Sequence, residues 1–280
     1  MACLWMDKEE APSFLSSSSG ERSETGGPSG AREREPVADE STDRIRVEQI
    51  AFGAAGSPGL RRKRGLPEDD ERRHGKGMSL RPLFVTQVYE VTLASTPNFD
   101  VFNAELAEAC RMLAAEDHAG RAWCKANAYR GYTSYGSLND LPQRLPEFAE
   151  LKRHLDRHAL AYARALNFDL ARKPRLDNLW VNILKPGGGH TGHIHPHAFL
   201  SGTVYVEVPD GASALKLEDP RLPMMMARPG VVPDAPDAEK PFVYLAPRAG
   251  TVLMWESWLR HEVPPNAAKA ERISISFNYA

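Results

Sequence analysis

The chemistry suggested by this chain is concentrated in its histidines. Four of its nine histidines, His190, His193, His195 and His197, follow directly on a Gly-Gly-Gly run at residues 187–189. In an extended strand, side chains alternate between faces, so His193 and His195 would point the same way, with Cα atoms roughly 6–7 Å apart. Two neutral imidazoles on one face can bind one metal ion. A polar surface strand can also carry a histidine pair, but the density of this cluster predicts a metal site.

A third metal ligand would have to come from a distant part of the chain. His261 is the only histidine after His197 and lies in the segment WLRHEVPP. On its own it could be a surface residue in a loop before Pro264. The residues that follow it decide how it is interpreted.

Arg272 and Ser274 lie in a segment, RISISF, that alternates polar and apolar residues. In a strand these two side chains share one face, while Ile273 and Ile275 occupy the other. An arginine inside a barrel needs an anion, because an unpaired buried charge is costly. Its guanidinium could bind a carboxylate in a bidentate manner, with the serine hydroxyl adding a hydrogen bond. If the polar face points to solvent instead, this is an ordinary amphipathic strand, and the segment alone leaves both interpretations open.

Two helices are expected upstream of the histidines. Asn98 or Asp100 can cap a helix that runs to about Leu113. Pro146 can open a second helix that runs to about Leu166. A strand-like run at residues 83–93 precedes the first helix, and residues 129–138 are expected to form a loop between the two.

The second expected helix carries another histidine pair. His154 and His158 lie four residues apart, a spacing that places both on one helical face. Charged residues surround them in the sequence. We therefore expect a solvent-exposed face here and not a second metal site.

After Pro174 the helical periodicity disappears and short strand-like runs follow. Proline, glycine and aspartate separate these runs, a pattern typical of a barrel or sandwich. With two helices bracing one face of the sheet, the fold class is α+β. The expected strands are residues 179–184, 200–208, 214–218, 243–245, 251–255 and 272–279.

The first part of the chain differs in composition from the rest. Residues 1–77 are rich in Ser, Gly and alternating charge, with few large apolar side chains, so disorder is expected there. The basic run at residues 61–64 is interpreted as solvated, although an interaction patch is the alternative. The functional protein could also begin near Met78. The expected folded domain is therefore residues 78–280, with a strand-rich core from about residue 176 onward.

Composition limits the function classes. The formal net charge of −2 argues against a general nucleic-acid binder. No apolar run approaches the ~20 residues that span a bilayer, and charged residues occupy positions 7–10, where a signal peptide needs its apolar core. The cysteines are few and scattered, as in a reducing compartment. We therefore expect a cytoplasmic protein without membrane segments.

Taken together, these residues resemble the double-stranded β-helix oxygenases that use Fe(II) and 2-oxoglutarate. In that family an HxD/E pair and a later histidine bind iron, and a following arginine, often within RxS, binds the far carboxylate of 2-oxoglutarate. More narrowly, several runs are similar to bacterial 2OG-Fe(II) oxygenases that share HxH. These runs are residues 180–182, 193–196, 200–206, 218–221, 255–264 and 272–278.

The resemblance implies a double-stranded β-helix core, of the jelly-roll or cupin-like kind, braced by the N-terminal helices. It implies an Fe(II)- and 2-oxoglutarate-dependent dioxygenase that hydroxylates a small-molecule or amino-acid substrate with O2, releasing succinate and CO2. The implied metal ligands are His193, His195 and His261. Arg272 and Ser274 are the implied binding residues for 2-oxoglutarate. Asn182 could hydrogen-bond the co-substrate, or it could have only a structural role.

One position departs from the wider family, because His195 occurs where most members have a carboxylate. Three neutral imidazoles leave an Fe(II) site more positive than two imidazoles and a carboxylate. Asp219 or His197 could instead join the metal site. The alternative functions are a cupin-like dioxygenase with three histidines and no 2-oxoglutarate, and a metal- or ligand-binding module without turnover. A regulatory protein acting through the basic N-terminal run is a further alternative.

A long segment between two expected strands, residues 222–242, contains five prolines and the triplet Met224–Met226. Connections of this length are usually lids or disordered segments. The methionines could cover a substrate, because methionine adapts to irregular surfaces, or they could pack in the core. Trp255 and Trp258 are expected to belong to the barrel wall.

Overall fold

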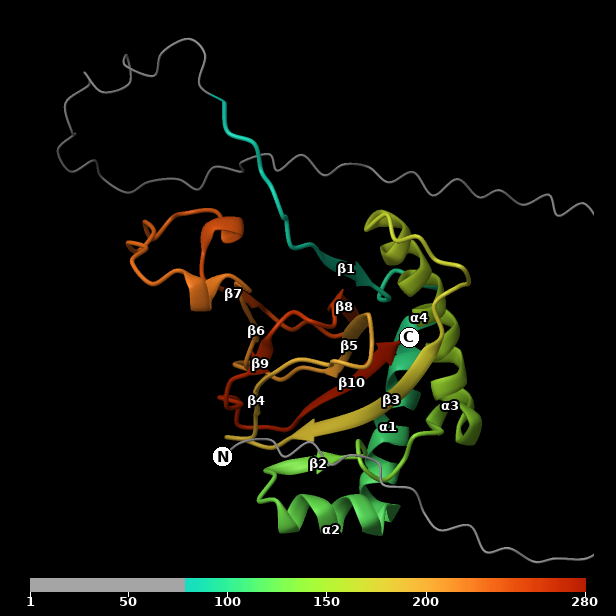
Figure 1. Ribbon diagram of the computed structural model, residues 1–280. Coiled ribbons are helices and arrows are strands. Elements are labelled where there is room, and N and C mark those ends of the chain that lie inside the picture. Colours follow the sequence, from blue (N-terminus) through green and yellow to red (C-terminus); the bar gives the residue numbers. More distant parts are fainter. Residues whose placement is uncertain (1–78) are drawn as a thin grey trace, which may run out of the picture. The chain divides into compact units, whose positions relative to one another are not determined.

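The computed structural model describes residues 79–280. Residues from Pro82 to Ala280 form one compact unit. The expected disorder of residues 1–77 and the basic run at residues 61–64 lie outside the described residues. The described unit combines α-helices with two antiparallel sheets (Figure 1), which confirms the predicted α+β class.

The larger sheet has six antiparallel strands with β5 and β10 at its centre. Strand β10 pairs with β3 on its other side, and Ser274 lies opposite Asn182 in that register. The strands, in sheet order, are β1 (Val88–Thr92), β8 (Thr251–Glu256), β5 (Leu200–Glu207), β10 (Arg272–Tyr279), β3 (Leu176–Leu184) and β2 (Gly131–Thr133).

The smaller sheet has four antiparallel strands and carries His190, His193 and His261. In sheet order they are β4 (His190–His193), β9 (His261–Val263), β6 (Leu215–Glu218) and β7 (Phe242–Leu245). The register of β4 and β9 places His193 opposite His261.

Helices cover the outer face of the larger sheet, as Figure 1 shows for α1, α3 and α4. The helices are α1 (Phe99–Glu116), α2 (His118–Ala126), α3 (Leu141–Arg144) and α4 (Pro146–Ala165). Their buried apolar side chains pack with those of the sheet into the main core. This packing fixes one face of the larger sheet and leaves the other face for the site.

Successive side chains of β10 point to opposite faces of the larger sheet, so that one set enters the main core and the other set lines the site. Ile273, Ile275 and Phe277 point into the main core among the helices. Arg272 and Ser274, on the opposite face, line a pocket between the sheets. A second apolar cluster beside this pocket joins side chains from both sheets. The segment alone left two interpretations open, and the structure has Arg272 and Ser274 buried on the inner face and not exposed to solvent.

The two predicted helices are confirmed, and α4 begins at Pro146 as expected. The first helix ends at Glu116, three residues beyond the prediction, and Asn98 is its N-cap residue. The expected loop at residues 129–138 contains the short strand β2, and α2 was not predicted at all. Of the run at residues 83–93, only β1 forms a strand.

The prediction that His154 and His158 face solvent is wrong. The side chain of His154 is only 16% exposed and its ring lies 5.8 Å from that of Phe102. Nδ1 of His158 forms a hydrogen bond with the Tyr89 hydroxyl at 3.0 Å. Both histidines thus help to attach α4 to its neighbours, and among the described residues neither belongs to a group that could bind metal.

The segment between β6 and β7 extends away from the sheets in Figure 1 and contains two short 3-10 turns, Leu222–Met224 and Asp237–Glu239. Met224 and Met226 are 72% and 94% exposed, so these two do not pack in the core as one interpretation held. Among the described residues, no helix is both long and apolar enough to cross a membrane.

Candidate metal centre

Three histidines from distant parts of the chain converge between the two sheets. One ring nitrogen from each of His193, His195 and His261 lies within 4.8 Å of the others. The ring centroids are 4.4 Å apart for His193 and His261, 5.0 Å for His193 and His195, and 5.2 Å for His195 and His261. Three imidazole nitrogens this close can bind a single metal ion.

Two different local structures position these rings. The pairing of β4 with β9 places His193 beside His261. His195 was expected to share a strand with His193, but β4 ends at His193 and that interpretation is wrong. Instead, the main-chain N–H of His195 donates to the carbonyl of Ser257 at 2.9 Å, which directs this loop back toward the triad.

Backbone carbonyls fix the tautomers of two of the rings. Nδ1 of His193 lies 2.7 Å from the Thr191 carbonyl oxygen, and Nδ1 of His261 lies 2.9 Å from the Leu259 carbonyl oxygen. A carbonyl can only accept, so each Nδ1 carries the proton and donates it. Each Nε2 is therefore left with its lone pair available for a metal.

Burial keeps these imidazoles neutral. It lowers the pKa of His195 to about 3, with a smaller contribution from the neighbouring His193. The pKa of His261 also lies well below its usual value, again chiefly because of burial. Both rings are therefore uncharged at neutral pH, which is the form that binds metal.

Arg272 is a buried cation with spare hydrogen-bonding capacity. It is 2% exposed, and its Nη1 donates to the Ser213 carbonyl at 2.9 Å. Its Nε, together with the hydroxyl of Tyr205, is buried without a hydrogen-bond partner in the described part of the chain. The guanidinium carbon lies 5.0 Å from the centre of the Tyr205 ring. Unpaired buried donors are costly, so the geometry favours an anion here.

The histidine triad and Arg272 belong to one pocket. Strands of both sheets line it, so a ligand held at Arg272 would share an enclosed space with a metal held by the histidines. The lining residues are Trp180, Asn182, His190, His193, His195, Gly202, Thr203, Leu215, Trp255, His261, Val263, Arg272, Ser274 and Ser276.

Two further predicted residues also line this pocket. Ser274 is buried on the same face as Arg272. Asn182 accepts a hydrogen bond from the Thr133 hydroxyl at 2.9 Å and donates one to Ser276 at 3.1 Å. These bonds hold its amide in place and leave one amide hydrogen for another acceptor.

The two alternative ligands lie apart from the triad. Asp219 accepts hydrogen bonds from Nε and Nη2 of Arg221 at 3.0 and 2.8 Å. His197 is exposed. Within residues 79–280, the group that could hold a metal here consists of the three histidines alone.

The sequence assigned no role to several residues that lie in this pocket or contact the residues that line it. His190 pairs with the Tyr129 hydroxyl at 2.8 Å, and burial lowers its pKa to about 3. Tyr205 could have been found from its alternation with Thr203 on β5, but Tyr129 lies in a segment that was interpreted as a loop. Trp255 packs against His261 with ring centroids 4.7 Å apart and belongs to the wall as expected. Trp258, which was also expected there, is 44% exposed.

Comparison with known families now adds to this geometry. Residues 178–278 match the family described as "Putative 2OG-Fe(II) oxygenase". This match spans the triad and Arg272 and confirms the family that the sequence resemblance indicated. Residues 178–278 are thus similar to a family whose cofactors are iron and 2-oxoglutarate and whose oxidant is O2. No match was found among curated proteins.

Solved structures show a more distant likeness. One is a 2OG-Fe(II) oxygenase family oxidoreductase from Burkholderia pseudomallei, with 18% identity and a TM-score of 0.34, covering 48% of this chain and 57% of that one. Another is the epimerase SnoN in complex with Fe3+, alpha ketoglutarate and nogalamycin RO, with 16% identity, a TM-score of 0.49 and coverage of 69% and 78%. A Pseudomonas putida prolyl-4-hydroxylase has 18% identity, a TM-score of 0.45 and coverage of 70% and 94%.

The residues present fit the family's cofactors. The triad offers neutral nitrogen donors, which suit a divalent transition metal. Arg272 and Tyr205 offer unsatisfied donors, which suit a carboxylate. The three histidines and Arg272 line the same pocket.

Proposed function

We propose that this protein is an Fe(II)- and 2-oxoglutarate-dependent oxygenase that hydroxylates a small-molecule or amino-acid substrate. The observation that carries the proposal is the presence, in one buried pocket, of three converging neutral histidines and an arginine whose Nε has no partner among the described residues. The family match over residues 178–278 supports the same reaction class.

His193, His195 and His261 are the proposed iron ligands. Three protein ligands leave coordination positions open for a chelating co-substrate and O2. The carbonyls that accept from Nδ1 of His193 and His261 keep these rings oriented toward the ion. The absence of a carboxylate from this set leaves the bound ion more positive than in an HxD/E site.

Arg272 is the proposed residue that binds the far carboxylate of 2-oxoglutarate. Ser274 lies on the same face of β10, and the Tyr205 hydroxyl lies on the neighbouring strand β5. A carboxylate here would give Arg272 and Tyr205 the partners they lack. Asn182 is proposed as a further co-substrate contact through its remaining amide hydrogen.

The two sheets are proposed to form a double-stranded β-helix. The larger sheet contributes the anion-binding side of the pocket and the smaller sheet contributes most of the metal-binding side. Trp180 and Trp255 line the pocket and limit the access of water to it. When bound, iron would use O2 and 2-oxoglutarate together, so that one oxygen atom enters succinate as CO2 is released and the other is inserted into a substrate C–H bond.

Succinate formation tests the reaction class. The full chain would be purified without oxygen, supplied with Fe(II), 2-oxoglutarate and air, and assayed for succinate. We expect slow, iron-dependent succinate release that is lost in His261→Ala and in Arg272→Ala. The assignment is wrong if 2-oxoglutarate neither binds to the iron-loaded protein nor turns over. A cupin-like site without co-substrate then becomes the better account.

A further inference from the structure

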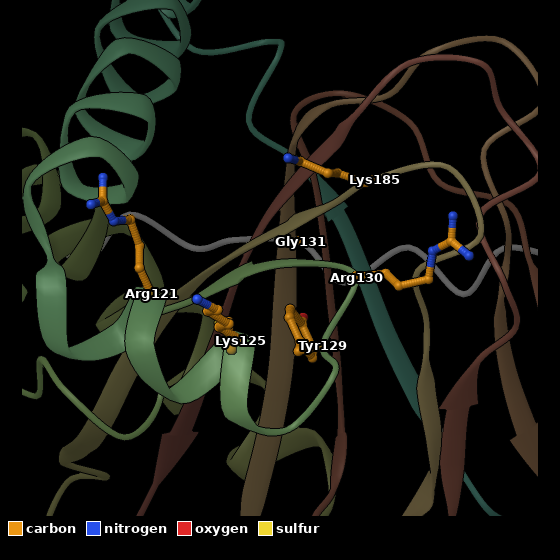
Figure 2. Close-up of a pocket in the computed structure, with 7 residues that line it drawn as sticks. Arg121, Lys125, Tyr129, Arg130, Gly131 and Lys185 are labelled. Carbon is orange, nitrogen blue, oxygen red and sulfur yellow. The ribbon is translucent and has the colours of Figure 1, made fainter.

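A second pocket lies outside the metal centre and is lined mainly by cations. It has a volume of about 330 Å³ and is formed by α2, β2 and the end of β3 (Figure 2). Its lining residues are Arg121, Cys124, Lys125, Tyr129, Arg130, Gly131 and Lys185. Four of these seven residues carry positive charge, and none is acidic.

The positive charge of this pocket is poorly compensated. Lys185 has one weak ion pair, with Glu271 at 4.0 Å. Lys125 and Arg130 make no ion pair with any residue in the described part of the chain, and neither does Arg121, whose Nη1 donates to the Ala115 carbonyl. Like charges that share a concave surface raise the local positive potential, which attracts anions.

The placement of these cations suits a ligand within the hollow. Figure 2 shows Arg121 and Lys125 projecting from α2, with Lys185 extending toward the pocket from the end of β3, while the guanidinium of Arg130 is turned away. At the base of the pocket the two backbones approach closely, because a Cβ at Gly131 would lie 1.9 Å from the Ile183 carbonyl oxygen. Strand β2 therefore lies tightly against β3.

We propose that this basic pocket binds a small molecule that carries phosphate groups. Several cations around one hollow favour an anion with more than one negative charge over a single carboxylate. Lysine ammonium groups bind phosphate oxygens as point charges, and arginine can add a bidentate contact. A volume of about 330 Å³ accommodates such a ligand.

The basic pocket adjoins the metal centre without being part of it. Tyr129 lines the basic pocket, and its hydroxyl bonds to Nε2 of His190, which lines the metal pocket. No histidine of the triad and no atom of Arg272 lines the basic pocket. Binding here can therefore be measured without iron or 2-oxoglutarate.

Pyrophosphate is the probe for this site. Calorimetric titration of the metal-free full chain would compare the wild type with the double variant Lys125→Gln/Lys185→Gln. The matched control is Arg172→Gln/Lys173→Gln, which removes the same charge from exposed positions elsewhere. We expect one bound pyrophosphate, an affinity that weakens as salt increases, and at least a tenfold loss in the pocket variant only.

Two results would overturn the proposal. The first is absence of pyrophosphate binding, or an equal loss in the pocket and control variants, because either would mean that no site exists at this pocket. The second is citrate binding as tightly as pyrophosphate, because the pocket would then select carboxylates and not phosphates. All substituted side chains are exposed, so circular dichroism should show unchanged folding in every variant.

Discussion

Nδ1 of His195 lies 3.4 Å from Nδ2 of Asn278, and both side chains are buried. The other end of the amide, Oδ1, accepts a hydrogen bond from Ser201 at 2.7 Å, and Ser201 lies 2.7 Å from the Ser257 hydroxyl. If His195 is to give Nε2 to a metal, Nδ1 must carry the proton and needs an acceptor. Rotation of the Asn278 amide supplies that acceptor, because the serine hydroxyls can reverse their donor and acceptor roles.

Asn278 should therefore orient His195 for metal binding. Asn278→Leu removes the acceptor and should weaken Fe(II) affinity by about 10–100-fold, the usual effect of losing such a partner. Asn278→Asp keeps an acceptor and should retain or raise the affinity. Anaerobic titration with Fe(II), or with Co(II) as a stable substitute, measures both. Equal affinities for wild type and Asn278→Leu would show that Asn278 has no role in the metal site.

Tyr205→Phe should have opposite effects on stability and binding. The substitution removes a buried hydroxyl that lacks a partner in the described part of the chain, so the ligand-free protein should become slightly more stable. The same change removes a proposed donor to 2-oxoglutarate and should weaken its binding by about fivefold to tenfold, given the ~1 kcal/mol of a typical hydrogen bond. Thermal unfolding and calorimetry provide the two readouts. Unchanged binding would remove Tyr205 from the co-substrate site.

The metal-free protein should lose stability as the pH falls below about 6.5, the ordinary pKa of histidine. The pKa values of His190 and His195 in the folded state are about 3, so between these limits the unfolded chain binds more protons than the folded one. Stability is therefore full above pH 6.5 and falls progressively toward pH 3. The unfolding temperature measured from pH 7.5 to 5 should show this decline. His195→Gln should make the decline shallower. A flat profile in the wild type would contradict the prediction.

Gly202 allows two strands to approach β5 closely. An added Cβ would lie 2.4 Å from the ring of Phe277 and 2.5 Å from the Leu253 carbonyl oxygen. Gly202→Ala should therefore reduce the free energy of unfolding by about 1–3 kcal/mol through overpacking. Gly230→Ala, where no atom lies within 4 Å of the new Cβ, is the matched control. Urea unfolding of both variants measures the difference, and equal midpoints would show that β5 can shift to admit the methyl group.

Periodicity and motif spacing were sufficient to predict much of the fold. The alternation of polar and apolar residues predicted β10, and Pro146 predicted the start of α4. Both are local signals, and both predictions are confirmed. The short strands β2 and β9 were missed because three residues carry too little pattern, and they form only through pairing with β3 and with β4 and β6. Helix α2 has only nine residues and was missed.

The site was predictable as a set of residue types but not as a geometry. The spacing of His193 and His195 suggested one strand face, whereas the structure places His195 beyond the strand and secures it through Ser257. The hydrogen bond between Tyr129 and His190 joins two segments that are distant in the sequence, so no local sequence pattern could predict it. The inward orientation of Arg272 could be decided only by the packing of the helices on the opposite face of β10.

The most direct test of the central claim is a titration of 2-oxoglutarate into anaerobic, Fe(II)-loaded protein. Wild type and Arg248→Gln, which removes an exposed arginine elsewhere, should bind one equivalent with the same affinity. Arg272→Gln should still bind Fe(II) but lose 2-oxoglutarate affinity by about 10–100-fold, as expected for a charge-assisted hydrogen-bonded pair. The account would be contradicted by failure of the wild type to bind 2-oxoglutarate, or by equal affinity in wild type and Arg272→Gln.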